Sequence, residues 1–444
     1  MCEMRPIKEL FDFEKGTLQS TKCVPGKYHF ITAAEQWKTH NSYTHDCDAL
    51  IFAMAASGSL GRTHYISGKF ISSDLCFILT PKKSLKLDLK FYHHLFNFLR
   101  EPIVKKIATG TSKLAINQTN FGEYLLPFFE YSHQIKFRDK MDAILKCKNS
   151  FHALIDDQQC FLNKLRQQIL QEAVEGKLTA DWRKRNPHLI SGENHAAKLL
   201  EKIKAEKTRL IAEGKIKKDK PLPPITDAGI PFQLPSGWAY CRLGGTLARV
   251  ETGATPLTSN PTYYTNGSVN WITSSASNNL FVCSPDKLIT ERALHETNCK
   301  IFPIGTLIIA MYGQGKTRGQ ITELKIPAAT NQACAALELY LQNEYLKKYL
   351  KIFFLKKYDE MRALASGGAQ PNLNMEKIKR TVIALPPVSE QKIITERVGK
   401  LMLMINDIEK QVYDRKEQSA MLMQSVLREA FNQEDKLAGV GHAN

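Results

Sequence analysis

The segment LIIAMYGQGKTRG, from Leu307 to Gly319, contains residue types that could bind phosphate. Its Gly315-Lys316-Thr317 is similar to the end of a P-loop, in which backbone N–H groups and a lysine surround the phosphates of a nucleotide. A P-loop also needs an earlier glycine, at the position that Ala310 occupies here. Ala310 instead ends an apolar run that predicts a buried strand. The loop is therefore not predicted to bind a nucleotide.

Other residues with catalytic chemistry do not form complete motifs. The sequence NPTY at residues 260–263 is similar to the Asn-Pro-Pro-Tyr motif of amino-methyltransferases, but Thr262 replaces the second proline. Asp286 and Glu291 would need a lysine at Ala293 to form a nuclease-like motif. The histidines lack carboxylate or cysteine partners at metal-binding spacings. The sequence therefore predicts a protein that is not itself an enzyme.

The loop sequence occurs twice in the chain. The segment LIFAMAASGSLGR at residues 50–62 matches it at an offset of 257, which is 307 − 50. The same offset reaches the C-terminal part, where LRQQILQEAVE from Leu165 matches LMQSVLREAFN from Leu422. Before residue 50 the copies still match, for example Gly16 with Gly253, at a shorter offset. The chain is therefore predicted to be a tandem duplication of one long unit.

Each copy begins with a globular part. Short β-like runs between Gly, Ser, Asn and Pro turns predict strands at residues 28–32 and 49–53 in the first copy, and at 269–273 and 306–311 in the second. An amphipathic helix is predicted near residues 88–108 and again near residues 344–365. These patterns predict a domain of mixed strands and helices in each copy.

Each copy ends with a long helix that has coiled-coil spacing. Alternating steps of four and three give eleven positions in each helix, eight of them apolar. A helix of about 45 residues is roughly 70 Å long. The two helices are predicted to pair with each other, and the alternative is two independent amphipathic surface helices. The predicted seam positions are Phe137, Met141, Ile144, Lys148, Phe151, Ile155, Gln158, Leu162, Leu165, Ile169 and Glu172, and Ile394, Val398, Leu401, Ile405, Ile408, Val412, Arg415, Ser419, Leu422, Val426 and Glu429.

These patterns divide the chain into segments. Residues 1–131 and 236–388 are predicted as the two globular domains, and residues 132–185 and 389–433 as the two long helices. Residues 186–235 form a basic, proline-rich linker, and residues 434–444 a tail. Pro221, Pro223 and Pro224 cannot continue a helix, so the linker is predicted to be exposed.

The formal net charge of +17 favours a negatively charged binding partner. From Lys177 to Lys220 there are thirteen Lys or Arg residues against six acids. A basic surplus favours nucleic acid as partner, and a solvated linker that binds nothing is the alternative for this segment. No apolar run approaches the ~20 residues that span a bilayer, no signal peptide opens the chain, and the ten cysteines form no Cys-x-x-Cys pair. We expect a cytoplasmic protein with reduced thiols, no structural zinc and no membrane partner.

Four segments carry a family resemblance: LRQQILQEAVEGKL with its echo LREAF, LPPVSEQKII from Leu385, GWAYCRLG from Gly237, and TNQAC from Thr330. Together with the duplication, they resemble the specificity (S) subunit of type I restriction-modification enzymes over nearly the whole chain. The resemblance implies an α+β fold. Two target-recognition domains related by tandem duplication would each be followed by a long helix, and the helices would pair as an antiparallel coiled coil.

The resemblance also implies a function without catalysis in this chain. Each domain would read one half of a split sequence in double-stranded DNA, and the helices would set the distance between the halves. Two modification (methyltransferase) subunits would supply S-adenosylmethionine chemistry, and restriction (translocase and nuclease) subunits would add ATP- and Mg-dependent cleavage. The alternative is a coiled-coil scaffold or a DNA-binding protein without such partners.

The DNA-binding residues are predicted mainly in the repeated loop. Arg318 and Gln314 suit guanine and adenine edges, and Lys316 suits a phosphate. The alternative for Arg318 is an ion pair with Glu323. In the first copy, Arg62 is matched with Arg318, and Asp74 replaces Asn331. The predicted DNA-binding set is Tyr312, Gln314, Lys316, Arg318, Ser274, Ser275, Asn331 and Gln370 in the second domain, and Ser57, Ser59, Arg62 and Lys113 in the first.

Overall fold

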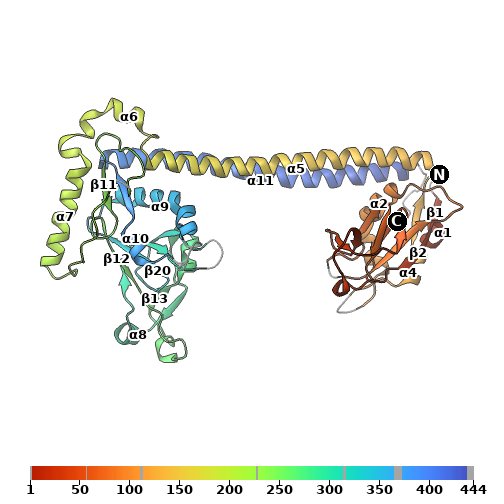
Figure 1. The fold of residues 1–444 in the computed structure, drawn as a ribbon, viewed down its shortest axis with the longest axis horizontal. Coiled ribbons are helices and arrows are strands. Elements are labelled where there is room, and N and C mark those ends of the chain that lie inside the picture. The colour runs from red at the N-terminus through yellow and green to blue at the C-terminus, as the bar shows by residue number, and fades with distance from the viewer. Residues whose placement is uncertain are drawn as a thin grey trace. The chain divides into compact units, whose positions relative to one another are not determined.

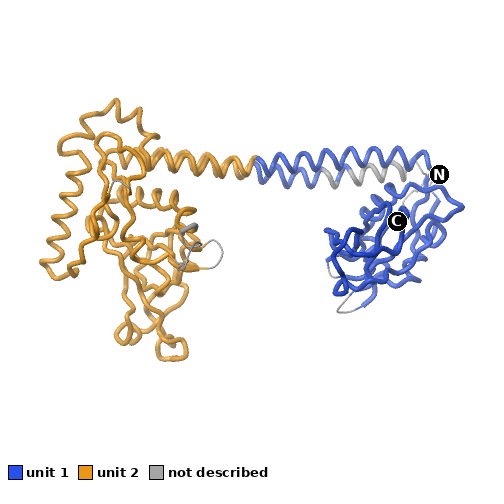
Figure 2. The backbone as a smooth tube through the Cα atoms, viewed as in Figure 1, with its two compact units in different colours: residues 1–157, 412–444 blue, residues 158–411 orange. Residues whose placement is uncertain are grey.

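The computed structural model describes residues 3–56, 58–110, 114–226, 229–313, 317–364 and 373–437. Its contacts divide into two compact units, Met1–Asp157 with Val412–Asn444, and Gln158–Gln411 (Figure 2). Each unit holds one globular domain and part of a pair of long helices (Figure 1). The globular domains mix strands and helices, as the sequence predicts.

The two domains contain the same central sheet, which confirms the duplication. In both, a buried strand from the repeated loop segment lies in the interior of the sheet between antiparallel neighbours. The strand order in the first domain is β2 (Phe11–Lys15), β9 (Cys76–Pro81), β6 (Ala49–Ala53), β7 (Thr63–Ile66). In the second it is β12 (Ala248–Thr252), β20 (Cys334–Leu339), β17 (Leu307–Ala310), β18 (Ile321–Leu324), with β14 (Phe281–Val282) added at the edge.

A second sheet and a short strand pair repeat in the same way. The second sheet is β4 (Lys38–His40), β3 (Tyr28–Ile31), β8 (Lys69–Ser72), β5 (His45–Asp46) in the first domain, and β15 (Lys287–Ile289), β13 (Val269–Ile272), β19 (Ala328–Thr330), β16 (Ile301–Phe302) in the second. The strand pairs are β1 (Glu3–Pro6) with β10 (Leu125–Phe128), and β11 (Ala239–Arg242) with β21 (Val382–Leu385).

Close backbone contacts explain the glycines that the copies share. A Cβ on Gly16 would lie 2.2 Å from the Ser73 carbonyl oxygen, and a Cβ on Gly253 would lie 1.8 Å from the Thr330 carbonyl oxygen. Both glycines allow the chain to cross the end of the second sheet, where no side chain fits.

The predicted amphipathic helices cover the central sheets. In the first domain the helix is broken into α2 (Leu89–Phe98) and α3 (Arg100–Ile107), whereas the second has one helix, α9 (Glu344–Leu364). Pro102 accounts for the break because it has no N–H for the i−4 hydrogen bond. The shorter helices are α1 (Ile7–Leu10), α4 (Gln118–Glu123), α8 (Glu291–Glu296) and α10 (Met375–Lys379).

The long helices α5 (Tyr131–Val174) and α11 (Val388–Leu437) pair antiparallel. In one unit the Arg166 guanidinium bonds the Glu409 carboxylate at 2.9 Å, and in the other Lys416 lies 3.5 Å from Asp156. The seam buries Ile155, Leu162 and Ile169 of α5, and Ile394, Val398, Ile405 and Val412 of α11. The prediction that the two helices pair is confirmed.

The predicted seam is wrong at several positions. Leu165 is 46 % exposed and Leu422 is 66 % exposed, and Gln158, Ile408 and Arg415 are exposed as well. Arg166 takes an interface position instead of Leu165, where its Nη1 donates to Met402 Sδ at 3.4 Å. The buried positions recur every seven residues, at Ile155, Leu162 and Ile169 and at Val398, Ile405 and Val412, and the exposed positions lie between them. The helices therefore bury mainly one of the two rows of the predicted seam.

The segment between the copies is more ordered than an exposed linker. Gly176, at φ +71°, ends the first helix before residue 185, and α6 (Ala180–Arg185) follows as a separate helix. Helix α7 (Ala196–Ala212) buries Ala196, Leu199 and Ile203, which are spaced for one helix face. Arg242 of β11 donates to the carbonyl oxygens of Pro223 and Pro224, and these bonds attach the proline-rich segment to the second domain. Among the described residues, no helix is long and apolar enough to cross a membrane.

Candidate nucleic-acid interface

The repeated loop of the second domain connects two antiparallel strands, β17 and β18. A phosphate-binding P-loop instead leads from a strand into a helix, whose N-terminus faces the phosphates. Gly313 (φ +155°) and Gly319 (φ +85°) bound its apex. The Gly319 N–H donates to the Ala310 carbonyl oxygen at 2.8 Å and closes the base of the loop. The loop is thus a glycine-bounded hairpin connection. Gln314 and Lys316 lie outside the described residues.

Arg318 is the cationic side chain in the described part of this loop. It is partly buried, its Nε is shielded from solvent, and this atom has no hydrogen-bond partner within the described residues. A buried donor without an acceptor lowers stability by about 1–3 kcal/mol, so an incoming acceptor would be favoured here. The neighbouring Tyr312 is 36 % exposed.

The predicted alternative of an Arg318–Glu323 ion pair does not occur. Glu323 on β18 is 3 % exposed and is bonded by Lys325 at 2.8 Å, Lys347 at 3.0 Å and Lys351 at 3.2 Å. Burial raises the pKa of Glu323, but the three lysines outweigh it and lower this pKa to about 2. Two of these lysines belong to α9, so the cluster fastens the loop's outgoing strand to the helix.

Two further turns lie beside the loop. The 3₁₀ helix η6 (Ser274–Asn278) is capped by Thr273, whose side chain accepts from the Ser275 N–H. Its last residue meets the loop, because the Thr317 hydroxyl donates to Asn278 Oδ1 at 3.2 Å. The turn at Asn331 meets the other side, where the Met311 N–H donates to the Ala333 carbonyl oxygen at 2.7 Å. The structure therefore brings Ser274, Ser275, Arg318, Tyr312 and Asn331 to one end of the domain.

Some polar groups in these turns are already used by the fold. Asn331 Oδ1 accepts from the Ala333 N–H at 3.1 Å, which leaves its amide nitrogen as the available donor. Thr317 and Asn278 were missed by sequence reasoning, although both are polar and lie in the same turns. The signal that could have identified Asn278 is the run of Ser and Asn residues after Ile272, which is typical of an exposed turn. Gln370 lies outside the described residues.

The loop of the first domain corresponds to that of the second but is one residue shorter. The Gly61 N–H donates to the Ala53 carbonyl oxygen at 2.8 Å, just as Gly319 donates to Ala310. Counting from these equivalent bonds, the counterpart of Arg318 is Leu60, which is 8 % exposed. The sequence match of Arg62 with Arg318 is therefore wrong, because an offset read from identities cannot locate a one-residue insertion within a Gly- and Ser-rich loop.

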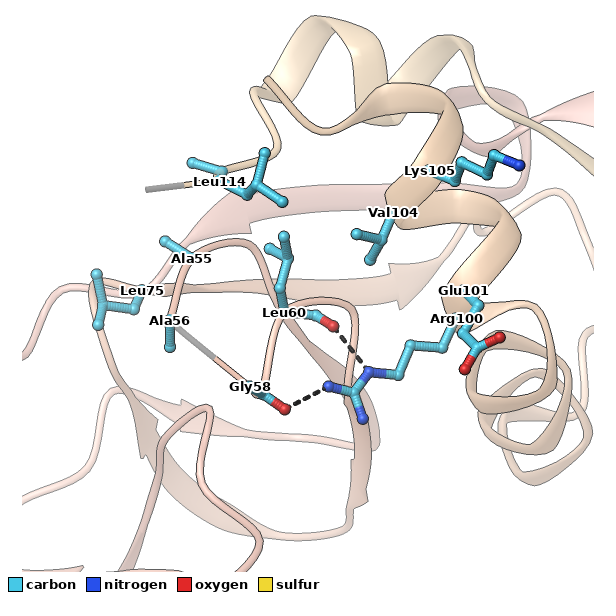
Figure 3. A pocket seen from close by; sticks show the side chains of 11 residues that line it. Ala55, Ala56, Gly58, Leu60, Leu75, Arg100, Glu101, Val104, Lys105 and Leu114 are labelled. Atoms are coloured by element: carbon cyan, nitrogen blue, oxygen red, sulfur yellow. Dashed lines mark hydrogen bonds between the residues drawn. The ribbon is translucent and has the colours of Figure 1, made fainter. Parts of the chain in front are cut away.

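Arginines hold the first loop in place. Arg62 donates to the Ala33 carbonyl oxygen at 3.2 Å and to Ser59 Oγ at 3.3 Å. Arg100 of α3 donates to the carbonyl oxygens of Leu60 at 2.8 Å and Gly58 at 2.7 Å (Figure 3). A cavity of about 940 Å³, lined mainly by apolar side chains, lies between this loop and α3. The predicted residues Ser57 and Lys113 lie outside the described residues.

These features define a class of protein with two similar α+β domains, each presenting a polar hairpin loop and each joined to one helix of an antiparallel pair. The family model described as "Type I restriction modification DNA specificity domain" matches residues 2–157 and 235–417. The chain therefore belongs to the type I restriction-modification DNA specificity family.

Several curated relatives and solved structures are similar to the chain. It is 25 % identical to the Escherichia coli type I restriction enzyme EcoDI specificity subunit, over 96 % of this chain and 87 % of that one. The EcoAI subunit of Escherichia coli is 29 % identical over 61 % of this chain, and the EcoEI subunit 43 % identical over 22 %. The chain spans only 45 % and 15 % of the lengths of these last two relatives.

Two solved structures have the same fold. A chain from a study of the assembly and conformational transition of the type I restriction-modification system has a TM-score of 0.58 and 14 % identity, with 97 % of both chains covered. The HsdS subunit from Thermoanaerobacter tengcongensis has a TM-score of 0.50 and 15 % identity, with 97 % of this chain and 96 % of that chain covered.

Proposed function

We propose that this chain is the DNA-recognition subunit of a type I restriction-modification complex. Each domain would place its hairpin loop and the adjoining turns in the grooves of one half of a split target. The observation that carries the proposal is the repeated loop, joined in each copy to one helix of an antiparallel pair. Arg318 supports base reading, because its buried Nε lacks an acceptor among the residues described.

The chain would bind partners through its helices and supply no catalytic chemistry itself. Two modification subunits would dock on the two helix copies and bring S-adenosylmethionine, and restriction subunits would bring ATP- and Mg-dependent translocation and cleavage. Leu165 and Leu422 support this arrangement, because they occupy the same repeat position and both are exposed. The complex would act in the cytoplasm, where its DNA target is found.

The test is methylome sequencing of cells with and without this gene. The expected result is the loss of one bipartite adenine-methylation motif when the gene is removed. An unchanged methylome in cells that express the modification subunits would contradict the proposal. Methylation or cleavage by the purified chain alone would indicate a self-contained enzyme, and binding to modification subunits without sequence-dependent DNA retention would indicate a scaffold.

A further inference from the structure

The side chain of Glu390, at the start of α11, lies at the junction of several segments of the second unit. It is fully buried, with 0 % exposure. Its Oε1 accepts from the Thr179 hydroxyl at 2.6 Å and from the Arg183 guanidinium, and its Oε2 accepts from Trp238 Nε1 at 2.8 Å. Thr179 and Arg183 follow the end of α5, and Trp238 precedes the first strand of the second recognition domain. One carboxylate thus connects both helices, at one end of their pair, to the domain.

Further contacts fix the same three segments. Arg183 Nη2 donates to the Gly176 carbonyl oxygen at 2.8 Å. A Cβ on Gly176 would lie 2.8 Å from Pro235 Cγ and 2.9 Å from Trp238 Cζ2, so the chain passes close to the domain at the point where it leaves α5. The Ser389 hydroxyl, next to Glu390, donates to the Leu189 carbonyl oxygen at 2.6 Å.

The first unit has a different junction. The repeat counterpart of Glu390 is His133, since 390 − 257 is 133, and His133 is exposed. There the helix joins its domain through Phe137 and Met141 in the domain core, and through the buried amide of Gln134, whose Oε1 accepts from the Asp88 N–H at 2.7 Å. Arg138 adds a bond to Asp88 at 2.7 Å. The buried carboxylate is therefore a feature of the second junction and was not inherited unchanged by both copies.

A buried charge is an unusual way to gain stability, because taking it out of water offsets most of the attraction to its partner. Apolar contact is non-directional, whereas hydrogen bonds weaken steeply away from a linear geometry. Donors from separate segments that converge on one carboxylate therefore define an orientation. Such a junction suits a domain whose angle to the helix pair matters for function.

We propose that Glu390, with Thr179, Arg183 and Trp238, is a positioning site that fixes the second recognition domain on the helix pair and so sets how strictly the complex measures the gap in its target. This proposal rests on the proposed function. It assigns these residues no contact with DNA. The half-sequence read by the second domain depends on its loops, and the tolerance for gap length depends on this junction.

The experiment uses the full chain assembled with modification subunits. Methylation is measured on duplexes that carry both native half-sequences with the native gap, or with a gap one base pair shorter or longer. Trp238→Phe removes the N–H donor but keeps an aromatic ring against Tyr349, whose ring centroid is 6.3 Å away. Glu390→Gln removes the charge. Glu376→Gln, at an exposed carboxylate on α10, is the matched control.

Loss of a hydrogen bond to a charged group amounts to about tenfold or more in an equilibrium constant. We expect the preference for the native gap over the altered gaps to fall by roughly this factor in Trp238→Phe and Glu390→Gln, with half-sequence selectivity unchanged. If Glu390→Gln does not fold, Trp238→Phe decides. A folded Trp238→Phe with wild-type gap preference, or one that loses methylation equally on all duplexes, would overturn the proposal. A wild-type complex without any sequence preference would instead refute the proposed function.

Discussion

Arg318 and the other arginines around the two loops have different environments, and the difference predicts different effects of mutation. Arg62 and Arg100 bond main-chain carbonyl oxygens, whereas Arg318 has a buried Nε without an acceptor among the described residues. We expect Arg318→Ala to weaken recognition of one half-sequence by ~1–3 kcal/mol, the discrimination that a bidentate base contact provides. The measurement is methylation of duplexes in which each half-sequence is altered in turn.

The matched control for Arg318→Ala is Arg380→Ala. Arg380 is exposed and its Nε pairs with Glu376 at 2.7 Å within one helical segment, so its loss should leave both half-sequences fully recognised. Normal methylation at every native site in the Arg318 variant would show that this loop does not read DNA.

Glu323→Gln should destabilise the second domain by about 3 kcal/mol at neutral pH, because three lysines lose a buried counterion. The pKa of Glu323 is lowered from 4.5 to about 2. A carboxyl with a lowered folded pKa contributes stability above its unfolded pKa, and this contribution is lost as the pH falls through the folded value. The wild-type domain should therefore lose stability between pH 4.5 and about 2.

Urea unfolding at neutral pH and between pH 4.5 and about 2 checks the two parts of the Glu323 prediction. The glutamine variant should lack the portion of the acid dependence that belongs to this group. Glu376→Gln is again the control, because its carboxylate is exposed. A Glu323 variant as stable as the wild type at neutral pH would show that the lysine cluster does not brace the loop.

At the residue scale, the local structure around a residue was easier to predict than the side chains that it contacts. The sequence correctly indicated a polar glycine-bounded turn after a buried strand, because glycine spacing and apolar runs are local signals. It could not show that Glu323 forms ion pairs with two lysines of α9, because those contacts depend on how a helix distant in sequence packs on the sheet. Glu390 was also not singled out, because its repeat counterpart is a histidine and the duplication gave no signal there.

At the scale of elements, the antiparallel helices predict a measurable spacer. Lys416 and Asp156 face each other, so the region of Gln158 faces residues just before Lys416. Inserting four residues near Gln158, with a matching insertion in the facing part of α11, would add about 6 Å, close to two base pairs. We expect the gap in the methylated motif to lengthen while both half-sequences stay the same. Methylome sequencing would show this, and altered half-sequences would refute the spacer role.

The exposed leucines on the helices predict where the modification subunits bind. We expect Leu165→Lys to weaken binding of one modification subunit by about tenfold, because a buried apolar contact would be replaced by a charge. The double variant with Leu422→Lys should lose both subunits. Leu288→Lys, at a 43 % exposed leucine on β15, is the control. Sedimentation of the reconstituted complex measures the stoichiometry, and two bound subunits in the double variant would contradict the prediction.

The sequence predicted the elements well and their fine register poorly. The strands, the helices that cover the sheets and the helix pair could all be predicted from hydrophobic periodicity. The repeat helped because it provides two different sequences for each element. The seam failed at Leu165 because the four-and-three spacing contains two rows of residues and does not show which row faces the partner helix, and the row of Leu162 and Ile169 is the buried one there. The order of α7 and of the proline-rich part could not be read from composition, since it depends on Arg242 and on apolar positions that only packing identifies.

At the scale of the whole molecule, the first unit is built from both ends of the chain. It combines Met1–Asp157 with Val412–Asn444. Ending the chain at Gln411 should therefore uncover seam positions of α5 such as Ile155, which is 2 % exposed when the residues after Gln411 are present. We expect faster proteolysis of residues 131–157 and loss of bipartite methylation. Limited proteolysis with mass spectrometry checks this, and an unchanged cleavage pattern would contradict it.

Because the first unit combines the first and the last residues of the chain, it cannot finish folding until translation is nearly over. A ribosome adds roughly 5–20 residues per second and domains tend to fold as they emerge. The first recognition domain is complete long before Val412 is made, but the helix that leaves it must wait for the last part of the chain to cover its apolar side. During that interval, each nascent chain exposes an apolar helix surface, to which the helix of a second copy of the protein could bind. Expression level and translation speed are therefore expected to influence how much of the protein reaches its paired form.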